Sequence, residues 1–268
     1  MSDEVMTNGT ISADLKLSEN NAFCSIIFNY DASTATKDKV GDFYAAGLGY
    51  TFYLSIIKNS KDVEYISFIG DKSNINANKN YKLKVRVEGS NVILSVNGIE
   101  ALRSTLPYVL KEGSIGIWCA SVGDIEVSNL MIEKEEPNIF VVMQYTSPYN
   151  ELYNEVIKKI CKEYKINPIR TDERYGTGFI IADIVNDIKR SNFIIADISQ
   201  DNPNVFYEVG YAHAIGKQVI LIAEKERKLP FDISPFRTLF YENSISGKTK
   251  IEEGLRKNFQ AILGISGD

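Results

Sequence analysis

The sequence predicts two domains of different class: an all-β sandwich over residues 1–135 and an α/β domain with a parallel sheet over residues 138–268. Residues 10 to about 133 form short runs that alternate apolar and polar side chains, separated by Gly, Asn, Asp and Ser clusters. Beyond residue 137, continuous apolar runs alternate with stripes of helical spacing. The charged segment Glu133–Pro137 between them has the composition of a short linker.

The first domain is expected to consist of short antiparallel strands. Residues 81–88 alternate most cleanly, which predicts one buried and one solvated face. The buried face is expected to hold Tyr81, Leu83, Val85 and Val87, and the solvated face Lys82, Lys84, Arg86 and Glu88. The expected strands are Ile11–Leu17, Ala22–Asn29, Phe43–Gly49, Thr51–Lys58, Val63–Ile69, Tyr81–Glu88, Val92–Val96, Ser114–Ala120 and Ile125–Ile132.

The stretch Tyr81–Ile132 carries an alternating strand, a strand with Val96-Asn97-Gly98, the run Gly113–Trp118 and a last strand that ends at Ile132. These features resemble the end of a concanavalin-like or laminin-G-like jelly roll. The resemblance implies a jelly-roll sandwich, whose members often bind carbohydrate or mediate protein contacts. Trp118 is accordingly either a packing residue or a platform on which a sugar stacks.

In the second domain, strands and helices alternate along the chain, which predicts a parallel, doubly wound sheet. By analogy with flavodoxin-like folds, the strand order is expected to be 2-1-3-4-5. The helix at residues 178–190 is expected to turn Ile180, Ile181, Ile184, Val185 and Ile188 inward. The expected strands are Ile139–Met143, Asn167–Thr171, Asn192–Ile198, Gln218–Ala223 and Thr238–Tyr241, and the other helices lie near Leu152–Ile160, at Pro203–Ile215 and from about Lys248.

Composition and charge exclude several classes of protein. The net charge of −5 comes with 18 acidic and 13 basic residues before position 137 and 17 of each after it, so no basic surface for nucleic acid is implied. Three distant cysteines and a single histidine make a metal site or a disulfide framework unexpected. Neither a signal peptide nor a membrane-spanning run is evident, so we expect a cytoplasmic protein without a membrane partner.

A ligand of an open parallel sheet binds beyond the carboxyl ends of its strands. The loop after the third strand is the most informative one, because Asn202 can cap a helix with Pro203 in its first turn, whose positive end suits an anion. Glu208 follows one turn later among Phe206, Tyr207 and Tyr211. Burial of this carboxylate among aromatic side chains would raise its pKa.

The run from Asp197 to Ile220, which contains Asn202-Pro203-Asn204-Val205-Phe206-Tyr207-Glu208, resembles the signature of bacterial Toll/interleukin-1 receptor-like (TIR-like) domains and of nucleoside 2-deoxyribosyltransferases. The similarity covers roughly residues 138–243. It implies that Glu208 is the catalytic residue, which attacks or stabilises the anomeric carbon of a ribose, and that Asp197 lies near the sugar. The residues expected to bind the nucleotide are Gln144, Tyr145, Ser147, Asp172, Arg174, Asp197, Asn202, Asn204 and Tyr207.

A single carboxylate suits one reaction in particular. Nicotinamide leaves NAD as a neutral molecule and needs no proton donor, so one negative charge that stabilises the cationic sugar can suffice. The leading hypothesis is therefore an NAD glycohydrolase, with NAD as substrate and with neither a cofactor nor a metal. The family resemblance adds two expectations, a bacterial defence role and a homo-oligomer in the active state.

Two other functions stay open. The chain could be a non-catalytic module that binds a nucleotide signal or partner through the α/β domain and a glycan or protein through the sandwich. It could also be a deoxyribosyltransferase that exchanges bases between nucleosides. At the level of single residues, Glu208 could be a buried structural carboxylate, Asp197 could cap or bridge its loop, and His213 could simply pack.

Overall fold

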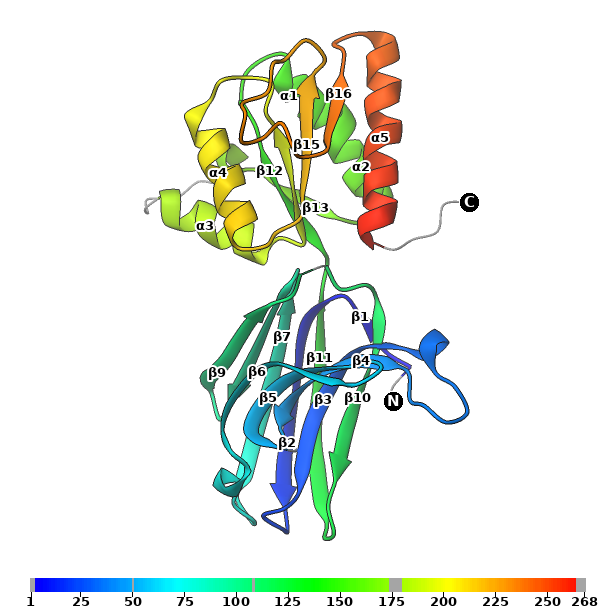
Figure 1. Cartoon of the computed structure of the whole chain (residues 1–268), viewed down its shortest axis with the longest axis vertical. Helices are drawn as coiled ribbons and strands as arrows, with labels where there is room; N and C mark the ends of the chain where they lie inside the picture. The colour runs from blue at the N-terminus through cyan, green and yellow to red at the C-terminus, as the bar shows by residue number, and fades with distance from the viewer. Residues whose placement is uncertain (1–2, 50, 108, 174–179, 264–268) are drawn as a thin grey trace. The chain divides into compact units, whose positions relative to one another are not determined.

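The computed structural model describes residues 3–49, 51–107, 109–173 and 180–263 (Figure 1). Its contacts divide the chain into two compact units. The first comprises Met1–Leu106 and Leu110–Glu135, and the second comprises Pro107–Val109 and Glu136–Asp268. Val109 groups with the second unit because its buried side chain belongs to that unit's apolar core.

The first unit is an antiparallel β sandwich, in agreement with the predicted class. One sheet has the order β1-β10-β3-β4-β5-β6 and the other β11-β2-β7-β8-β9. Two short 3-10 helices, Ala32–Thr34 and Lys72–Asn74, follow β3 and β6. The strands are β1 (Val5–Met6), β2 (Asn8–Leu17), β3 (Phe23–Asp31), β4 (Asp42–Leu48), β5 (Phe52–Asn59), β6 (Val63–Asp71), β7 (Asn80–Glu88), β8 (Asn91–Val96), β9 (Ile99–Thr105), β10 (Gly113–Ala120) and β11 (Ile125–Glu135).

Apolar side chains from both sheets form the core of the sandwich. In β7, the four side chains of the predicted inner face are at most 1% exposed. The expectation for Glu88 is wrong, because this residue is only 8% exposed. Its carboxylate lies 2.6 Å from Nε of Arg86, so the charge is paired where the strand ends.

The expected strands are all present, with ends displaced by up to three residues, but β1 and β9 were not expected. β1 has only two residues and pairs with β10. β9 is an edge strand whose one partner among the described strands is β8, and Ile99 is 72% exposed. Because an edge strand lacks a second neighbour and a fully buried face, its alternation is weak, and its ladder with β8 defines it.

Trp118 lies on the face of the six-stranded sheet that points away from the sandwich core. It is half-buried, and its ring makes edge contacts with Phe23 and Phe43 at centroid distances of 4.9 and 5.5 Å. A small apolar cluster of Ile27, Phe43, Ala45 and Ile57 lies beneath it. Trp118 therefore packs against its own sheet, and a role as sugar platform stays a prediction.

The second unit has a five-stranded, fully parallel sheet in the order β13-β12-β14-β15-β16, which is the expected order 2-1-3-4-5. The 3-10 turn at Thr171–Glu173 follows β13. The strands are β12 (Asn138–Val142), β13 (Asn167–Ile169), β14 (Phe193–Asp197), β15 (Val219–Glu224) and β16 (Thr238–Tyr241), and the helices are α1 (Tyr149–Leu152), α2 (Lys158–Glu163), α3 (Ile180–Arg190), α4 (Pro203–Ala214) and α5 (Ile245–Leu263).

Helices cover both faces of this sheet (Figure 1). The face that includes Ile139 and Val141 packs against α1, α2 and α5, and the face that includes Phe140 and Val142 packs against α3 and α4. The inward placement expected for Ile181 is wrong, because its side chain is 64% exposed. Ile188, by contrast, is fully buried, since only the stripe near positions 184 and 188 faces the sheet.

The helical segment after β12 is continuous but changes its winding. α1 leads into a π-helical turn at Tyr153–Ile157, which leads into α2. The predicted stripe is present, with Val156 and Ile160 buried and Leu152 half-buried. π-Helical turns are rare and occur frequently at functional sites, because they redirect the side chains of one turn.

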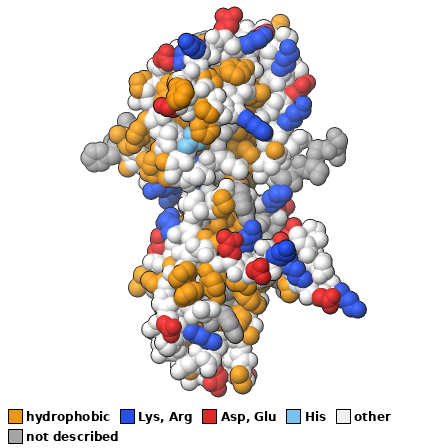
Figure 2. Space-filling view, in the orientation of Figure 1, with side chains coloured by type: hydrophobic (Ala, Val, Ile, Leu, Met, Phe, Trp, Pro, Cys, Tyr) orange, Lys and Arg blue, Asp and Glu red, His pale blue; other side chains and the backbone are white. Residues whose placement is uncertain are grey.

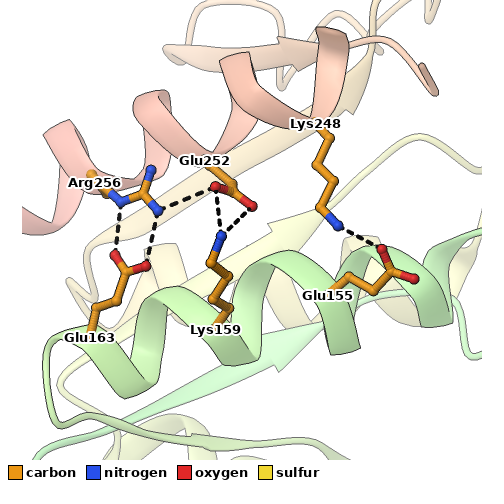
Figure 3. A network of polar contacts seen from close by, with 6 residues as sticks. All are labelled: Glu155, Lys159, Glu163, Lys248, Glu252 and Arg256. Carbon is orange, nitrogen blue, oxygen red and sulfur yellow. Dashed lines mark hydrogen bonds and ion pairs between the residues drawn. The ribbon is translucent and has the colours of Figure 1, made fainter. Parts of the chain in front are cut away.

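Charged side chains connect the helical segment after β12 to α5 (Figure 3). α5 begins at Ile245, earlier than expected, and the hydroxyl of Ser244 accepts a hydrogen bond from the Gly247 amide. The exposed pair of Lys248 with Glu155 contributes little stability, whereas the buried carboxylate of Glu252 is paired with both Lys159 and Arg256. The ion pairs are Lys248 with Glu155, Lys159 with Glu252, and Arg256 with both Glu163 and Glu252.

No helix in the described part of the chain is long and apolar enough to cross a membrane.

A fragment of residues 136–268 is expected to fold alone. Apart from Val109, every buried apolar residue on the two faces of the parallel sheet comes from this segment. Circular dichroism with a cooperative thermal melt checks the fragment, and the isolated first unit serves as comparison. Aggregation of the α/β fragment under conditions where the full chain is soluble would contradict the division into two cores.

Candidate functional site

The site is built at the carboxyl ends of β12 and β14, which are hydrogen-bonded neighbours. Asn202 follows β14 and caps α4, because its side-chain oxygen accepts a hydrogen bond from the Asn204 amide at 3.0 Å. Pro203 is the first helical residue, as the sequence predicts. The amide of Asn202 also donates to Oε1 of Gln144 at 2.7 Å, so the loops after β12 and β14 are directly joined.

Glu208 lies in the second turn of α4 and is only 7% exposed. Its neighbours on the inner side of the helix are apolar, among them Val205, Val209 and Ala212. Among the described residues, no cation or hydrogen-bond donor is paired with its carboxylate. Burial alone raises the pKa of Glu208 to about 7, so the group changes charge near neutral pH.

Tyr145 connects Glu208 with a second charged group. Its ring lies 5.0 Å from the guanidinium of Arg170. Burial raises the pKa of the Tyr145 hydroxyl, and the nearby carboxylates of Glu208 and Asp172 raise it further. Tyr145 is still 37% exposed, so its side chain is accessible to a ligand.

Arg170, at the end of β13, was not among the expected site residues. It is 6% exposed and binds Asp172 through two hydrogen bonds of 2.6 Å each. A third hydrogen bond of 2.9 Å joins it to Oδ1 of Asn150, and its guanidinium lies 4.2 Å from the ring of Tyr153 in the π-helical turn. Arg170 thus holds Asp172 and Tyr145 in place beside the site.

Asp197 is a buried carboxylate whose hydrogen-bond partners lie in the same unit. It is 4% exposed, and its two carboxylate oxygens accept hydrogen bonds from Ser199 and from the hydroxyl of Tyr241. Burial raises its pKa, against the opposing effect of these hydrogen bonds. The geometry favours a loop-bridging role, and a contact with substrate stays a prediction.

The remaining predicted residues are spread around the site. Ser147 donates a hydrogen bond to Glu151 at 2.9 Å and is exposed, as is the side chain of Asn204. Tyr207 is 57% exposed on the outer side of α4. Figure 2 shows hydrophobic side chains gathered on the visible face of the α/β unit. Arg174 lies outside the described residues.

His213 is a packing residue, as the sequence allows. Its ring stacks on Phe236 with centroids 4.3 Å apart and an interplanar angle of 14°. Burial lowers its pKa, which favours the neutral imidazole. The structure gives it no contact with Glu208 among the described residues.

A separate cavity of about 380 Å³ lies between the first helical segment and the start of α5. Its walls include Pro148, Glu155, Tyr241 and Lys248, and none of the predicted site residues. In the part of the chain that the structure describes, no group of three or more His, Cys, Asp or Glu side chains is arranged to hold a metal ion.

Comparison with known proteins gives coarse fold similarity. No family model matches the chain, and no curated protein matches its sequence. Among solved structures, a carbohydrate-binding module of Bacillus subtilis is 17% identical, with 50% of this chain and 80% of that one covered and a TM-score of 0.42. The TIR domain of a Toll-related receptor of Hydra magnipapillata is 16% identical, with 46% and 96% covered and a TM-score of 0.39.

A CMP N-glycosidase of Clostridium botulinum is also similar, at 16% identity, with 45% of this chain and 98% of that one covered and a TM-score of 0.35. At these identities and scores, the likenesses assign neither an activity nor a ligand to this chain. The site is therefore characterised by its own residues, above all the buried carboxylate of Glu208.

Glu208→Gln is expected to stabilise the fold. Since the folded-state pKa is raised above the ordinary value of 4.5, the folded state loses stability as the pH rises from about 4.5 to about 7, and the full loss is present above about pH 7. The amide carries no charge, so the variant should gain up to about 3 kcal/mol at pH 8 and almost nothing at pH 4.5. Urea melts at the two pH values measure the difference.

Asp197→Asn is the matched control, with the same chemical change in the same unit. An amide nitrogen cannot accept the hydrogen bonds that Ser199 and Tyr241 donate, so this variant should lose about 1–3 kcal/mol. Equal effects of the two substitutions would contradict the contrast between an unpaired and a fully bonded carboxylate.

Proposed function

We propose that this protein cleaves the N-glycosidic bond of a nucleotide, and that NAD is its substrate, with release of nicotinamide. The observation that carries the proposal is the buried carboxylate of Glu208 in α4, which has no partner among the described residues and lies at the edge of the sheet where parallel folds bind ligands. A carboxylate kept without a partner costs stability, which is typical of a functional group. The sequence resemblance from Asp197 to Ile220 points to the same residue.

Hydrolysis of the bond between ribose and nicotinamide in NAD needs only one carboxylate. The bond between the ribose C1′ and the nicotinamide nitrogen breaks, its electron pair leaves with nicotinamide, and positive charge develops on the sugar. The Glu208 carboxylate stabilises that charge strongly because its surroundings are apolar. Water then adds to C1′ and loses a proton, so that NAD⁺ and water give nicotinamide, ADP-ribose and H⁺.

The other residues of the site have binding roles in this proposal. The ring of Tyr145 is proposed to stack against the nicotinamide ring or the sugar near Glu208. Arg170, whose guanidinium lies 5.0 Å from this ring, keeps it in place. Asn202 and Gln144 fix the loops around the start of α4, whose positive dipole end suits a phosphate. Asp172, Arg174, Asn204 and Tyr207 are proposed to contact the rest of the nucleotide.

All of these residues lie in the second unit. The proposal therefore assigns the chemistry to the α/β unit, and regulation or assembly, through a glycan or protein, to the sandwich. A homo-oligomeric active state in the cytoplasm and a role in bacterial defence belong to the same proposal, and the experiments below include conditions that favour assembly.

Glu208→Gln should abolish nicotinamide release, with a loss of at least ~10²–10³ in kcat, because the amide keeps the shape but not the charge. A timed assay of NAD loss on the full chain, at low and at high protein concentration, measures it. Glu253→Gln makes the same change at an exposed position in α5 and should leave the rate unchanged. An active wild type whose Glu208→Gln variant keeps most of its rate would sink the mechanism.

The pH dependence tests the charge that Glu208 needs. If the ionised carboxylate acts, kcat/KM for NAD should fall about tenfold per pH unit below about pH 7 and level off above it. Initial rates from pH 5 to 9, corrected for folding by parallel melts, check this. A rate that instead falls above pH 7 would contradict the ionised form.

The raised pKa of Glu208 also favours a second candidate reaction. A carboxyl group half-protonated at neutral pH can donate a proton to a neutral base, as cleavage or exchange of an ordinary nucleoside requires. A falling pH profile, together with base transfer between nucleosides and inertness toward NAD, identifies this reaction. Inactivity toward both substrates under every assembly condition favours the non-catalytic binding module.

A further inference from the structure

Two of the three cysteines lie directly opposite each other in the sandwich. β3 and β10 pair in antiparallel fashion, and the register partner of Cys24 is Cys119. Residues that are opposite each other in such a pair project their side chains from the same face of the sheet. Both thiols are free, so the sheet holds a pair of reduced cysteines side by side.

The backbone at this pair already has the spacing of a disulfide. Opposite residues of antiparallel strands have Cα atoms about 4.5–5.5 Å apart, and disulfides join Cα atoms about 4.4–6.8 Å apart. Burial raises the pKa of the Cys24 thiol, and the Cys119 thiol raises it further, in keeping with contact between the two groups. A bond between the sulfurs therefore needs no rearrangement of the strands.

The two thiols differ in their access to solvent. Cys24 is fully buried in the core of the sandwich, whereas Cys119 is exposed near the end of β10. A soluble oxidant therefore reacts first with the thiol of Cys119, and the thiol of Cys24 is positioned next to it for the second step. Cys161, the remaining cysteine, is buried in the second unit and belongs to a different core.

We propose that Cys24 and Cys119 form a peroxide-responsive cysteine pair, in which a hydroperoxide converts the two thiols into a cross-strand disulfide. The Cys119 thiolate attacks the hydroperoxide, whose O–O bond breaks, to give a sulfenic acid and an alcohol, or water from hydrogen peroxide. The Cys24 sulfur then attacks the sulfenic sulfur and expels water. Two thiols and one hydroperoxide thus give one disulfide, one alcohol and one water.

Tryptophan fluorescence can report on a disulfide between these two strands. Trp118, the one tryptophan of the sequence, precedes Cys119, and its ring contacts Phe23, which precedes Cys24, at 4.9 Å. Because these rings lie on the opposite face of the same two strands, a bond between the sulfurs should change the tryptophan emission. The bond also closes a loop that contains most of the strands of the sandwich, so it should raise the Tm of that unit by roughly 10 °C.

The experiment treats the purified, reduced full chain with a small excess of hydrogen peroxide. Three readouts follow the reaction: a thiol count on the denatured protein, peptide mass mapping, and Trp118 fluorescence. Wild type should fall from three free thiols to one, yield a Cys24–Cys119 peptide lighter by two hydrogen atoms, and recover on treatment with dithiothreitol. Cys161→Ala, the matched control, should form the same bond.

Cys119→Ala changes an exposed position, so it should fold normally, and it should lose the disulfide, the fluorescence change and the rise in Tm. The proposal is overturned if wild type accumulates sulfinic acid at Cys119 without a link to Cys24. It is also overturned if the only disulfide formed joins Cys119 of two molecules, or if Cys119→Ala shows the same fluorescence change as wild type.

Discussion

The parallel pairing of β12 with β14 is the interaction on which the candidate site depends. These strands are far apart in sequence, and their register brings Val142 beside Ala196 at the same edge of the sheet. The loops that follow them therefore start side by side, which allows Asn202 to bond Gln144 and to cap α4 in the same place. The start of α4 fixes Glu208 in the second turn.

The position of α4 on the sheet also determines the pKa of Glu208. α4 must bury an apolar stripe against β12, β14 and β15, and Glu208 occupies this stripe between Val205 and Ala212. Desolvation then moves its pKa toward neutrality. Asp197, at the end of β14, shows the opposite solution for a buried carboxylate, since donors from Ser199 and Tyr241 engage both of its oxygens. Two acidic groups at one sheet edge thus differ in their hydrogen bonds, and only Asp197 has donors among the described residues.

In the sandwich, the two faces of the six-stranded sheet also carry different sets of side chains. Its alternating strands bury one set of side chains between the sheets, and the outer face of the six-stranded sheet carries a second apolar cluster beneath Trp118. Cys24 and Cys119 belong to the inner face and Trp118 to the outer face of the same strand pair. The same strand pair thus presents the two thiols on one face and the aromatic cluster on the other.

The sequence by itself determined the two fold classes, most strands and helices, the cap at Asn202 and the burial of Glu208, because periodicity and capping are local properties. It could not reveal Arg170: a lone arginine at a strand end has no local signal, although tyrosines at 145, 149 and 153 are spaced like one helical stripe. Only the tertiary structure stacked Arg170 on Tyr145 and Tyr153 and bonded it to Asp172. It also decided that, in the part of the chain that the structure describes, Asp197 is hydrogen-bonded and Glu208 is not, since partners such as Tyr241 come from segments distant in the chain.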